Sequence, residues 1–225
     1  MQVNPEIASV VKPDSPGAKM AFKVRKKIYR KLAGAIDLEQ LEKILDVGVT
    51  ADSAAAYSNF FECFYPHKDR IWALSDQAAG ELENIFPGLT FVQGDGCQLP
   101  FEDNSFDLVF SSAVIEHVGS YQRQKAFIAE AFRVSRKFVF LTTPNRWHLF
   151  EFHTYLPLLH WLPKRIYRFI LSRIGLKYLS KEENLNLLDK RTLKRICREL
   201  GVAPKIMTVK FLLMPSNLLV MLRKD

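Results

Sequence analysis

The stretch that decides the fold is TFVQGDGCQLPFEDNSFDLVFSSAVIEHV, residues 90–118. Residues 89–92 and 106–110 are short apolar runs, rich in β-branched and aromatic residues and ended by turn formers, a pattern typical of strands buried in a parallel sheet. Asp95 therefore follows the carboxyl end of a strand, where open α/β sheets bind ligands. Gly94 and Gly96 flank it, so a flat ligand can approach the backbone closely. The sequence here predicts either a binding loop or an ordinary turn.

The same alternation of buried strands and helical segments extends in both directions from this stretch. Strands are predicted at residues 43–49, 70–74, 89–92, 106–110, 137–143, 205–211 and 217–222. Helical spacing separates the first five strands, with Asp52 or Ser53 as the N-cap of the first helix and a helix from about Ser120 to Val134 before the fifth strand. This alternation implies parallel pairing with right-handed crossovers. We therefore predict an α/β fold: a doubly wound, Rossmann-like, mostly parallel seven-stranded sheet that ends in an antiparallel C-terminal strand pair.

Two segments fall outside this alternation. Residues 1–40 comprise a proline-containing arm and a basic amphipathic helix, whose apolar stripe contains Met20, Val24, Ile28 and Leu32. This helix either packs over the core or contacts an anionic membrane surface or an acidic substrate. Residues 41–225 form a single domain, in which residues 146–188 are an aromatic, basic, helical insertion after the fifth strand. We expect this insertion to cover the ligand end of the sheet.

Composition narrows the class of protein. The chain has 225 residues, 48% of them hydrophobic and 25% charged, as in a soluble globular protein. The net charge of +8 favours an acidic partner. Three distant cysteines, Cys63, Cys97 and Cys197, lack metal-ligand spacing, which predicts a reduced, cytoplasmic setting without structural zinc. Neither a signal peptide nor a membrane span is expected.

The motifs ILDVG (44–48), GDGCQLPF (94–101), FDLVFSSAVIEHV (106–118) and FLTTPN (140–145) occur in one order. As an ordered set, over roughly residues 44–145, they resemble a class I S-adenosylmethionine-dependent methyltransferase of the type 11 group. The resemblance implies S-adenosylmethionine as methyl donor and gives roles to residues. Asp46 and Gly48 would lie beside its methionine and ribose, and Asp76 would bind the ribose hydroxyls. Asp95 would bind the adenine amino group, with Gly96 and Cys97 near the ring. Ser111, Ser112 and Ala113 would line the methionyl end, and His117 would border the transfer site.

The sequence departs from the family pattern in two places. Thr50 and Asp52 occupy two of the three positions that are usually glycine in the first turn, and the ribose-binding acid is expected at Ser75, one place before Asp76. Asp52 would also set a carboxylate beside the phosphates of a dinucleotide, an unfavourable like-charge contact. S-adenosylmethionine has no phosphate, so the acidic turn disfavours binding of a dinucleotide more than binding of S-adenosylmethionine.

The predicted reaction is in-line transfer of the sulfonium methyl to a small-molecule or lipid-linked acceptor. Candidate catalytic bases are His117, His148 and His153, with Glu151 as a further base and Tyr155 as a hydroxyl that could orient the acceptor. His148, His153 and His160 do not share one helical face, so no metal is predicted. The reaction is expected to be metal-independent.

The insertion should select the acceptor. Its aromatic and basic side chains suit a greasy molecule with an acidic head, such as a lipid-linked glycan or a prenylated aromatic, or else they form the insertion's own core. Nucleic acid is disfavoured because the apolar content exceeds that of a phosphate-tracking groove. The alternative to an enzyme is a non-catalytic binding or scaffold protein with this fold, suggested by Thr50 and Asp52. The oligomeric state is left open.

Overall fold

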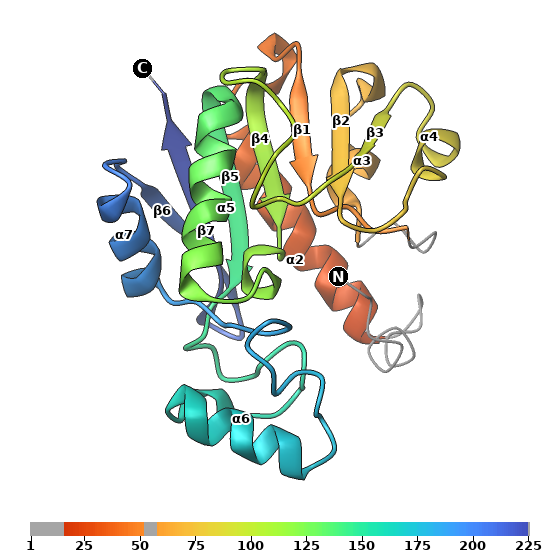
Figure 1. Ribbon diagram of the computed structural model, residues 1–225. Coiled ribbons are helices and arrows are strands. Elements are labelled where there is room, and N and C mark those ends of the chain that lie inside the picture. Colours follow the sequence, from red (N-terminus) through yellow and green to blue (C-terminus); the bar gives the residue numbers. More distant parts are fainter. Residues whose placement is uncertain (1–15, 52–57, 225) are drawn as a thin grey trace.

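The structure, a computed structural model, describes residues 16–51 and 58–224. Its centre is a seven-stranded sheet with the order β3-β2-β1-β4-β5-β7-β6 (Figure 1). The strands are β1 (Ile44–Val47), β2 (Ile71–Ser75), β3 (Thr90–Gln93), β4 (Phe106–Ser112), β5 (Ser135–Pro144), β6 (Lys205–Phe211) and β7 (Met214–Arg223). All seven predicted strands are present, with β5 and β7 longer than expected.

Strand direction divides the sheet into two parts. The pairs β1–β2, β1–β4, β2–β3 and β4–β5 are parallel, and Ile44 of β1 lies opposite Ile71 on one side and Leu108 on the other. β7 is antiparallel to both β5 and β6. The predicted doubly wound sheet with an antiparallel C-terminal pair is therefore confirmed. The order also reverses at β1 and β4, where such sheets form their ligand crevice.

Helices cover both faces of the sheet. They are α2 (Pro16–Ala33), η1 (Leu38–Gln40), α3 (Phe60–Phe64), η2 (Lys68–Arg70), α4 (Leu82–Ile85), η3 (Ile115–His117), α5 (Tyr121–Val134), η4 (Leu159–Trp161), α6 (Lys164–Arg173) and α7 (Lys190–Glu199). Local signals set several boundaries: Ser120 caps α5 by accepting a hydrogen bond from the Arg123 amide, and Asp189 caps α7 in the same way. The helix start expected at Asp52 or Ser53 lies outside the described residues.

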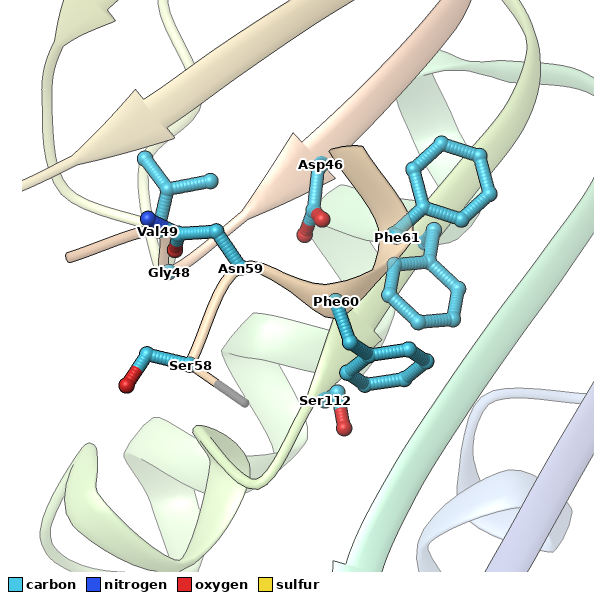
Figure 2. A pocket seen from close by; sticks show the side chains of 9 residues that line it. Asp46, Gly48, Val49, Ser58, Asn59, Phe60, Phe61 and Ser112 are labelled. Carbon is cyan, nitrogen blue, oxygen red and sulfur yellow. The ribbon is translucent and has the colours of Figure 1, made fainter. Parts of the chain in front are cut away.

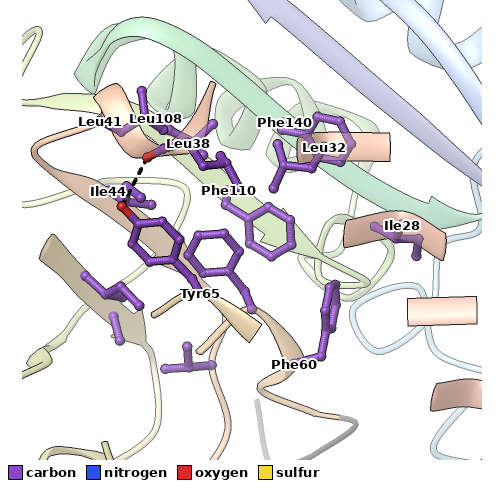
Figure 3. Close-up of a cluster of buried hydrophobic side chains, with 14 of the residues drawn as sticks. Ile28, Leu32, Leu38, Leu41, Ile44, Phe60, Tyr65, Leu108, Phe110 and Phe140 are labelled. Atoms are coloured by element: carbon purple, nitrogen blue, oxygen red, sulfur yellow. Dashed lines mark hydrogen bonds between the residues drawn. The ribbon is translucent and has the colours of Figure 1, made fainter. Parts of the chain in front are cut away.

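One core layer lies between the sheet and α2 (Figure 3). Ile28 and Leu32 of α2 are buried there, and Phe61 stacks on Phe110 with ring centroids 4.7 Å apart. Tyr65 is fully buried, and its hydroxyl donates a hydrogen bond of 3.2 Å to the carbonyl oxygen of Leu38. The apolar stripe of the basic helix is thus mainly committed to packing over the core, the first of the two expectations for it.

The second core layer joins the opposite face of the sheet to α5 and α7. The insertion has a small core of its own, made by Tyr167, Leu171, Leu179, Leu185 and Leu187. A β-bridge between Asn145 and Leu188 joins its two ends directly after β5. The insertion therefore lies at the carboxyl end of the central strands, below the sheet in Figure 1, as expected from its place in the sequence. Among the described helices, none combines the length and apolarity needed to cross a bilayer.

Candidate active site

A narrow pocket lies where β1 and β4 end (Figure 2). It is lined by Asp46, Gly48, Val49, Ser58, Asn59, Phe60, Phe61, Phe110 and Ser112. Three residues predicted to bind the donor, namely Asp46, Gly48 and Ser112, thus meet in one pocket. Its cavity volume is about 10 Å³, the room of roughly one water molecule. A larger ligand would have to move the side chains at its rim apart.

Gly48 forms the floor of the turn after β1. Its φ is +98°, and a Cβ atom added there would lie 2.2 Å from Cγ2 of Val114. Only glycine combines this backbone conformation with so close an approach. The single glycine that the sequence retains in this turn is therefore the one whose conformation requires it.

The pocket has an acidic wall. Asp46 is 5% exposed and Glu62 of α3 is fully buried. Burial raises the pKa of both carboxyl groups, and the neighbouring Glu62 raises the pKa of Asp46 further. Neither Glu62 oxygen nor the Thr50 hydroxyl has a hydrogen-bond partner of ordinary geometry among the described residues. Unpartnered buried acceptors beside a pocket fit a ligand that brings a positive charge or hydrogen-bond donors, as S-adenosylmethionine does.

Asn59 holds the turn in place of the missing glycines. Its side chain accepts a hydrogen bond from the Thr50 amide (3.0 Å) and donates one to the Thr50 carbonyl (2.8 Å). Thr50 is therefore accommodated by a clamp on its backbone. Asp52, the second departure from the family pattern, lies outside the described residues.

The Asp95 loop lies beside this pocket. Nη2 of Arg123 donates to both carboxylate oxygens of Asp95, at 3.0 and 2.9 Å, and the Cys97 amide donates to Oδ1 at 2.9 Å. Burial opposes ionisation, but these hydrogen bonds and the charge of Arg123 lower the pKa of Asp95. Gly96 packs against the core, since an added Cβ would lie 2.6 Å from the Phe127 ring. Asp95 is thus an ionised, exposed carboxylate with a partner that the sequence did not indicate.

The other residues predicted to bind the donor lie at the ends of β2 and β4. β2 ends at Ser75, which is buried, and Asp76 follows as an exposed residue. The Ser111 hydroxyl donates to the Val47 carbonyl at 2.7 Å and so ties β4 to β1. Ala113 turns the chain away from the sheet with a φ of +59°. Such a left-handed alanine is a strained position of the kind found at ligand sites.

A second polar cluster, here named the acid–histidine cluster, consists of Glu116, His117, Glu151 and His153. The Nε2 atoms of His117 and His153 are 3.0 Å apart, and His153 Nδ1 is 2.6 Å from Glu151 Oε1. Burial, together with the neighbouring His153, lowers the pKa of His117 to about 3. Burial also opposes the charge of His153, but the Glu151 carboxylate raises its pKa overall.

Glu116 completes this cluster from η3. It is fully buried, and its Oε2 accepts a hydrogen bond of 2.9 Å from the Thr143 hydroxyl. Its other oxygen, Oε1, has no hydrogen-bond partner among the residues that the structure describes and lies 4.0 Å from His117 Nε2. Burial raises the pKa of Glu116 to about 7. Ser112 of the pocket bonds to Thr142 and Glu116 bonds to Thr143, so the pocket and the cluster are attached to consecutive residues near the end of β5, whose side chains point to opposite faces of the sheet.

The structure separates the predicted histidines. His117 and His153 meet in the acid–histidine cluster, whereas His148 and His160 have other partners. Both ring nitrogens of His148 lie within 3.2 Å of backbone carbonyl oxygens, and His160 Nε2 lies 2.8 Å from the carbonyl of His148. Both rings are buried. Their geometry is that of residues that hold the insertion together.

Sequence reasoning missed three functional candidates. Glu62 and Glu116 are single acids within apolar runs, FFECF and AVIEHV, and this pattern could have indicated buried carboxyl groups. Arg123 has no such signal, because a basic residue on an exposed helix face is ordinary.

Comparisons with known proteins agree with this architecture. The family described as "Methyltransferase domain", type 11, matches residues 46–141. A stretch of 50 residues is 50% identical to part of a "Probable phthiotriol/phenolphthiotriol dimycocerosates methyltransferase 2" of Mycobacterium ulcerans. The stretch covers 22% of this chain and 18% of that relative. This match thus spans less than a fifth of the relative.

Solved structures share the fold at low identity. A SAM-dependent methyltransferase from Aquifex aeolicus superposes with a TM-score of 0.59 at 14% identity, over 95% of this chain and 98% of that one. Magnesium protoporphyrin IX methyltransferase from Synechocystis PCC 6803, solved with bound S-adenosylhomocysteine (SAH), gives a TM-score of 0.53 at 12% identity, over 92% and 84%. Residues 46–141, which include the strands that build the pocket, are thus similar to the methyltransferase domain of the type 11 group, and the chain shares the fold of solved S-adenosylmethionine-dependent methyltransferases.

Proposed function

We propose that this protein transfers the methyl group of S-adenosylmethionine to a small-molecule or lipid-linked acceptor. The observation that carries the proposal is the pocket lined by Asp46 and Gly48 at the carboxyl ends of β1 and β4, with the acid–histidine cluster attached to the same end of the sheet through β5. When bound, the donor supplies an electrophilic methyl on a sulfonium, and acceptor attack forms the new bond as the carbon–sulfur bond breaks and SAH leaves. The acidic wall favours this cation over a phosphate-bearing ligand.

The chain's own residues would divide the work between donor and acceptor. Asp46, Gly48 and the run Ser111–Ala113 would hold the methionyl and ribose part, and Asp76 the ribose hydroxyls. Asp95 would accept the adenine amino group beside Gly94, Gly96 and Cys97. His117 and His153 would contact the acceptor, because their partly exposed rings are the histidines closest to the pocket. His148 is left out because it is buried among backbone carbonyls.

The insertion supports an acceptor with an apolar body and an acidic head. Its exposed apolar side chains include Trp161, Ile166, Phe169 and Ile174, which are 40%, 48%, 58% and 52% exposed. Between Arg146 and Lys181 the chain carries seven basic residues and one acid, Glu151, which is buried. The matched fragment of a phthiotriol/phenolphthiotriol dimycocerosates methyltransferase supports the same class of acceptor. We place the reaction in the cytoplasm, at an anionic membrane surface that α6 contacts.

A second candidate function is binding without catalysis. It is favoured by the small volume of the pocket and by the salt bridge that occupies Asp95. The two functions differ in whether the donor binds and whether a labelled methyl group reaches an acceptor.

Titration with SAH tests the donor site. In the full chain, SAH at about 100 times its Kd stabilises the native state by about 2.7 kcal/mol, which a thermal-shift assay detects. Asp95→Ala should weaken SAH binding by on the order of tenfold or more, since a hydrogen bond to a charged group is lost. Asp103→Asn is the matched control, because Asp103 also pairs with an arginine, Arg133, but lies away from the pocket.

Labelled donor tests the transfer. Incubation with lipid extracts and radiolabelled S-adenosylmethionine should place label in the lipid fraction. Absence of SAH binding at millimolar concentration would overturn the proposed function. Donor binding without transfer to any acceptor in a broad screen would favour the binding protein instead.

A further inference from the structure

Three potential metal ligands converge at the acceptor side of the pocket. The Glu116 carboxylate, one nitrogen of His117 and one of His153 all lie within 4.8 Å of one another. Ligand atoms held at 2.0–2.2 Å around one tetrahedral ion lie ~3.3–3.6 Å apart, so side-chain movements of up to ~1 Å would bring the three into position. The ring planes of the two histidines stand at 81°, with their Nε2 atoms facing each other.

The outer hydrogen bonds of both histidines determine which nitrogen is available. His117 Nδ1 lies 2.7 Å from the carbonyl oxygen of Asn184, and His153 Nδ1 lies 2.6 Å from the Glu151 carboxylate. Both partners can only accept, so each Nδ1 carries the proton. The two Nε2 atoms face each other across 3.0 Å, a hydrogen-bond distance that is filled by a proton when one ring carries it and that a metal ion would fill in the proton's place.

This arrangement is the one that proteins use to orient metal-binding histidines. A ligating imidazole almost always donates its other N–H to a carboxylate or a backbone carbonyl, and here one ring has each type of partner. Glu116 adds the third ligand. Its Oε2 is fixed by Thr143, while Oε1 is fully buried, has no hydrogen-bond partner within residues 16–51 and 58–224, and lies 4.0 Å from His117 Nε2. A buried acceptor without a partner is an independent sign of a missing ligand.

We propose that Glu116, His117 and His153 bind one divalent first-row transition-metal ion, of which Zn²⁺ is the representative. Two imidazoles and one carboxylate match the ligands of open zinc sites, while Mg²⁺ and Ca²⁺ prefer oxygen ligands alone. The exposed edges of the two rings leave room for a further ligand from the acceptor. Resting on the proposed function, the inference gives the acceptor a metal-binding oxygen, such as a hydroxyl or phenol. A bound metal would take the place of an imidazole as the group that activates the acceptor. The reaction would then depend on metal, unlike the metal-independent reaction expected from the sequence.

Metal binding is tested without any methyl transfer. The full chain is stripped with a chelator and titrated with Co²⁺ while the visible d–d absorption is recorded. We expect saturation at one equivalent, and loss of affinity by on the order of 100-fold or more in His117→Gln and His153→Gln. Glu151→Gln changes a residue that positions His153, so it should lower the affinity for Co²⁺ by about 10–100-fold and shift the absorption spectrum. His67→Gln is the matched control, because His67 also pairs with a glutamate, Glu39, but lies outside the cluster.

A measurement on the unchanged protein guards against variants that fail to fold. Zinc-edge X-ray absorption of the Zn²⁺-loaded chain should show nitrogen and oxygen ligands with the scattering of two imidazoles. No saturable Co²⁺ binding, sulfur ligation, or binding that survives in both histidine variants would overturn the metal site. SAH titration of the stripped chain separates the two proposals: SAH binding without Co²⁺ binding rejects only the metal site, and Co²⁺ binding without SAH binding rejects only the donor site.

Discussion

Gly48, which lines the pocket, packs directly against Val114: a Cβ atom on Gly48 would lie 2.2 Å from Cγ2 of Val114. The turn after β1 thus packs directly on the segment that follows β4. Both walls of the pocket are therefore fixed by one contact, and any side chain at position 48 must separate them.

Gly48→Ala should destabilise the protein by about 2–4 kcal/mol, because a left-handed backbone and an overpacked contact both disfavour the methyl group. Gly175→Ala isolates the backbone part, since Gly175 also has a positive φ but no atoms near an added Cβ. Gly80→Ala, with open space and no positive φ, should be nearly neutral. Urea unfolding of the three variants measures the series. Equal effects at Gly48 and Gly175 would contradict the contact with Val114.

Glu62→Gln should raise the free energy of unfolding at pH 8. The same variant should bind the donor more weakly than the wild type does. Burial raises the folded pKa of Glu62, so wild-type stability falls as pH rises from the unfolded pKa through the folded one. Glutamine removes this dependence, so its advantage should disappear under mildly acidic conditions. Melting temperatures across pH, together with SAH titration, measure both effects. Glu81→Gln, at an exposed acid, is the control. A destabilised Glu62→Gln at pH 8 would show that the carboxylate is satisfied in the native state.

Asp107→Asn should lower the unfolding free energy by about 2 kcal/mol at pH 7. The Asp107 side chain is fully buried and accepts hydrogen bonds from the Glu42 and Lys43 amides and from Arg136. Burial opposes ionisation, but these bonds lower its pKa from 3.8 to about 2. Its stabilisation is complete above the unfolded pKa and is lost as pH falls towards 2.

Urea titrations at several pH values check this window. The difference between wild type and Asp107→Asn should shrink steadily below about pH 4. Asp103→Asn, at an exposed ion pair with Arg133, should cost less than about 1 kcal/mol. A difference for Asp107→Asn that is independent of pH would attribute its cost to geometry rather than charge.

Ile166→Ser combined with Phe169→Ser should weaken binding to anionic vesicles at least about tenfold, because two exposed apolar side chains of α6 lose their contact with lipid. Flotation with phosphatidylserine-containing vesicles measures the effect. Ile85→Ser on α4, also an exposed isoleucine, is the control. Equal binding of wild type and the α6 variant would remove α6 from the membrane contact, and binding without preference for anionic lipid would remove the role of its basic residues.

The strands and most helix boundaries were predictable because their signals are local. Apolar runs ended by turn formers indicated the positions of all seven strands, Ser120 marked the start of α5, and Pro163 precedes α6. Gly48 could be placed at the donor site because a turn with positive φ leaves a glycine in the sequence. The second strand was predicted at residues 70–74, and β2 runs from Ile71 to Ser75, one residue further.

Only the tertiary structure decided which polar groups meet. His117 and His153 are 36 positions apart, and Arg123 and Asp95 are 28 apart, so no local pattern pairs them. The burial of the two basic amphipathic helices could not be predicted from their sequences either. Ile28 and Leu32 of α2 are buried in the core, whereas Ile166 and Phe169 of α6 are exposed. The sequence alone thus determined the sheet and the resemblance to methyltransferases, because those depend on short motifs. The acid–histidine cluster depends on chain crossings between η3, β5 and the insertion, which only folding brings within bonding distance.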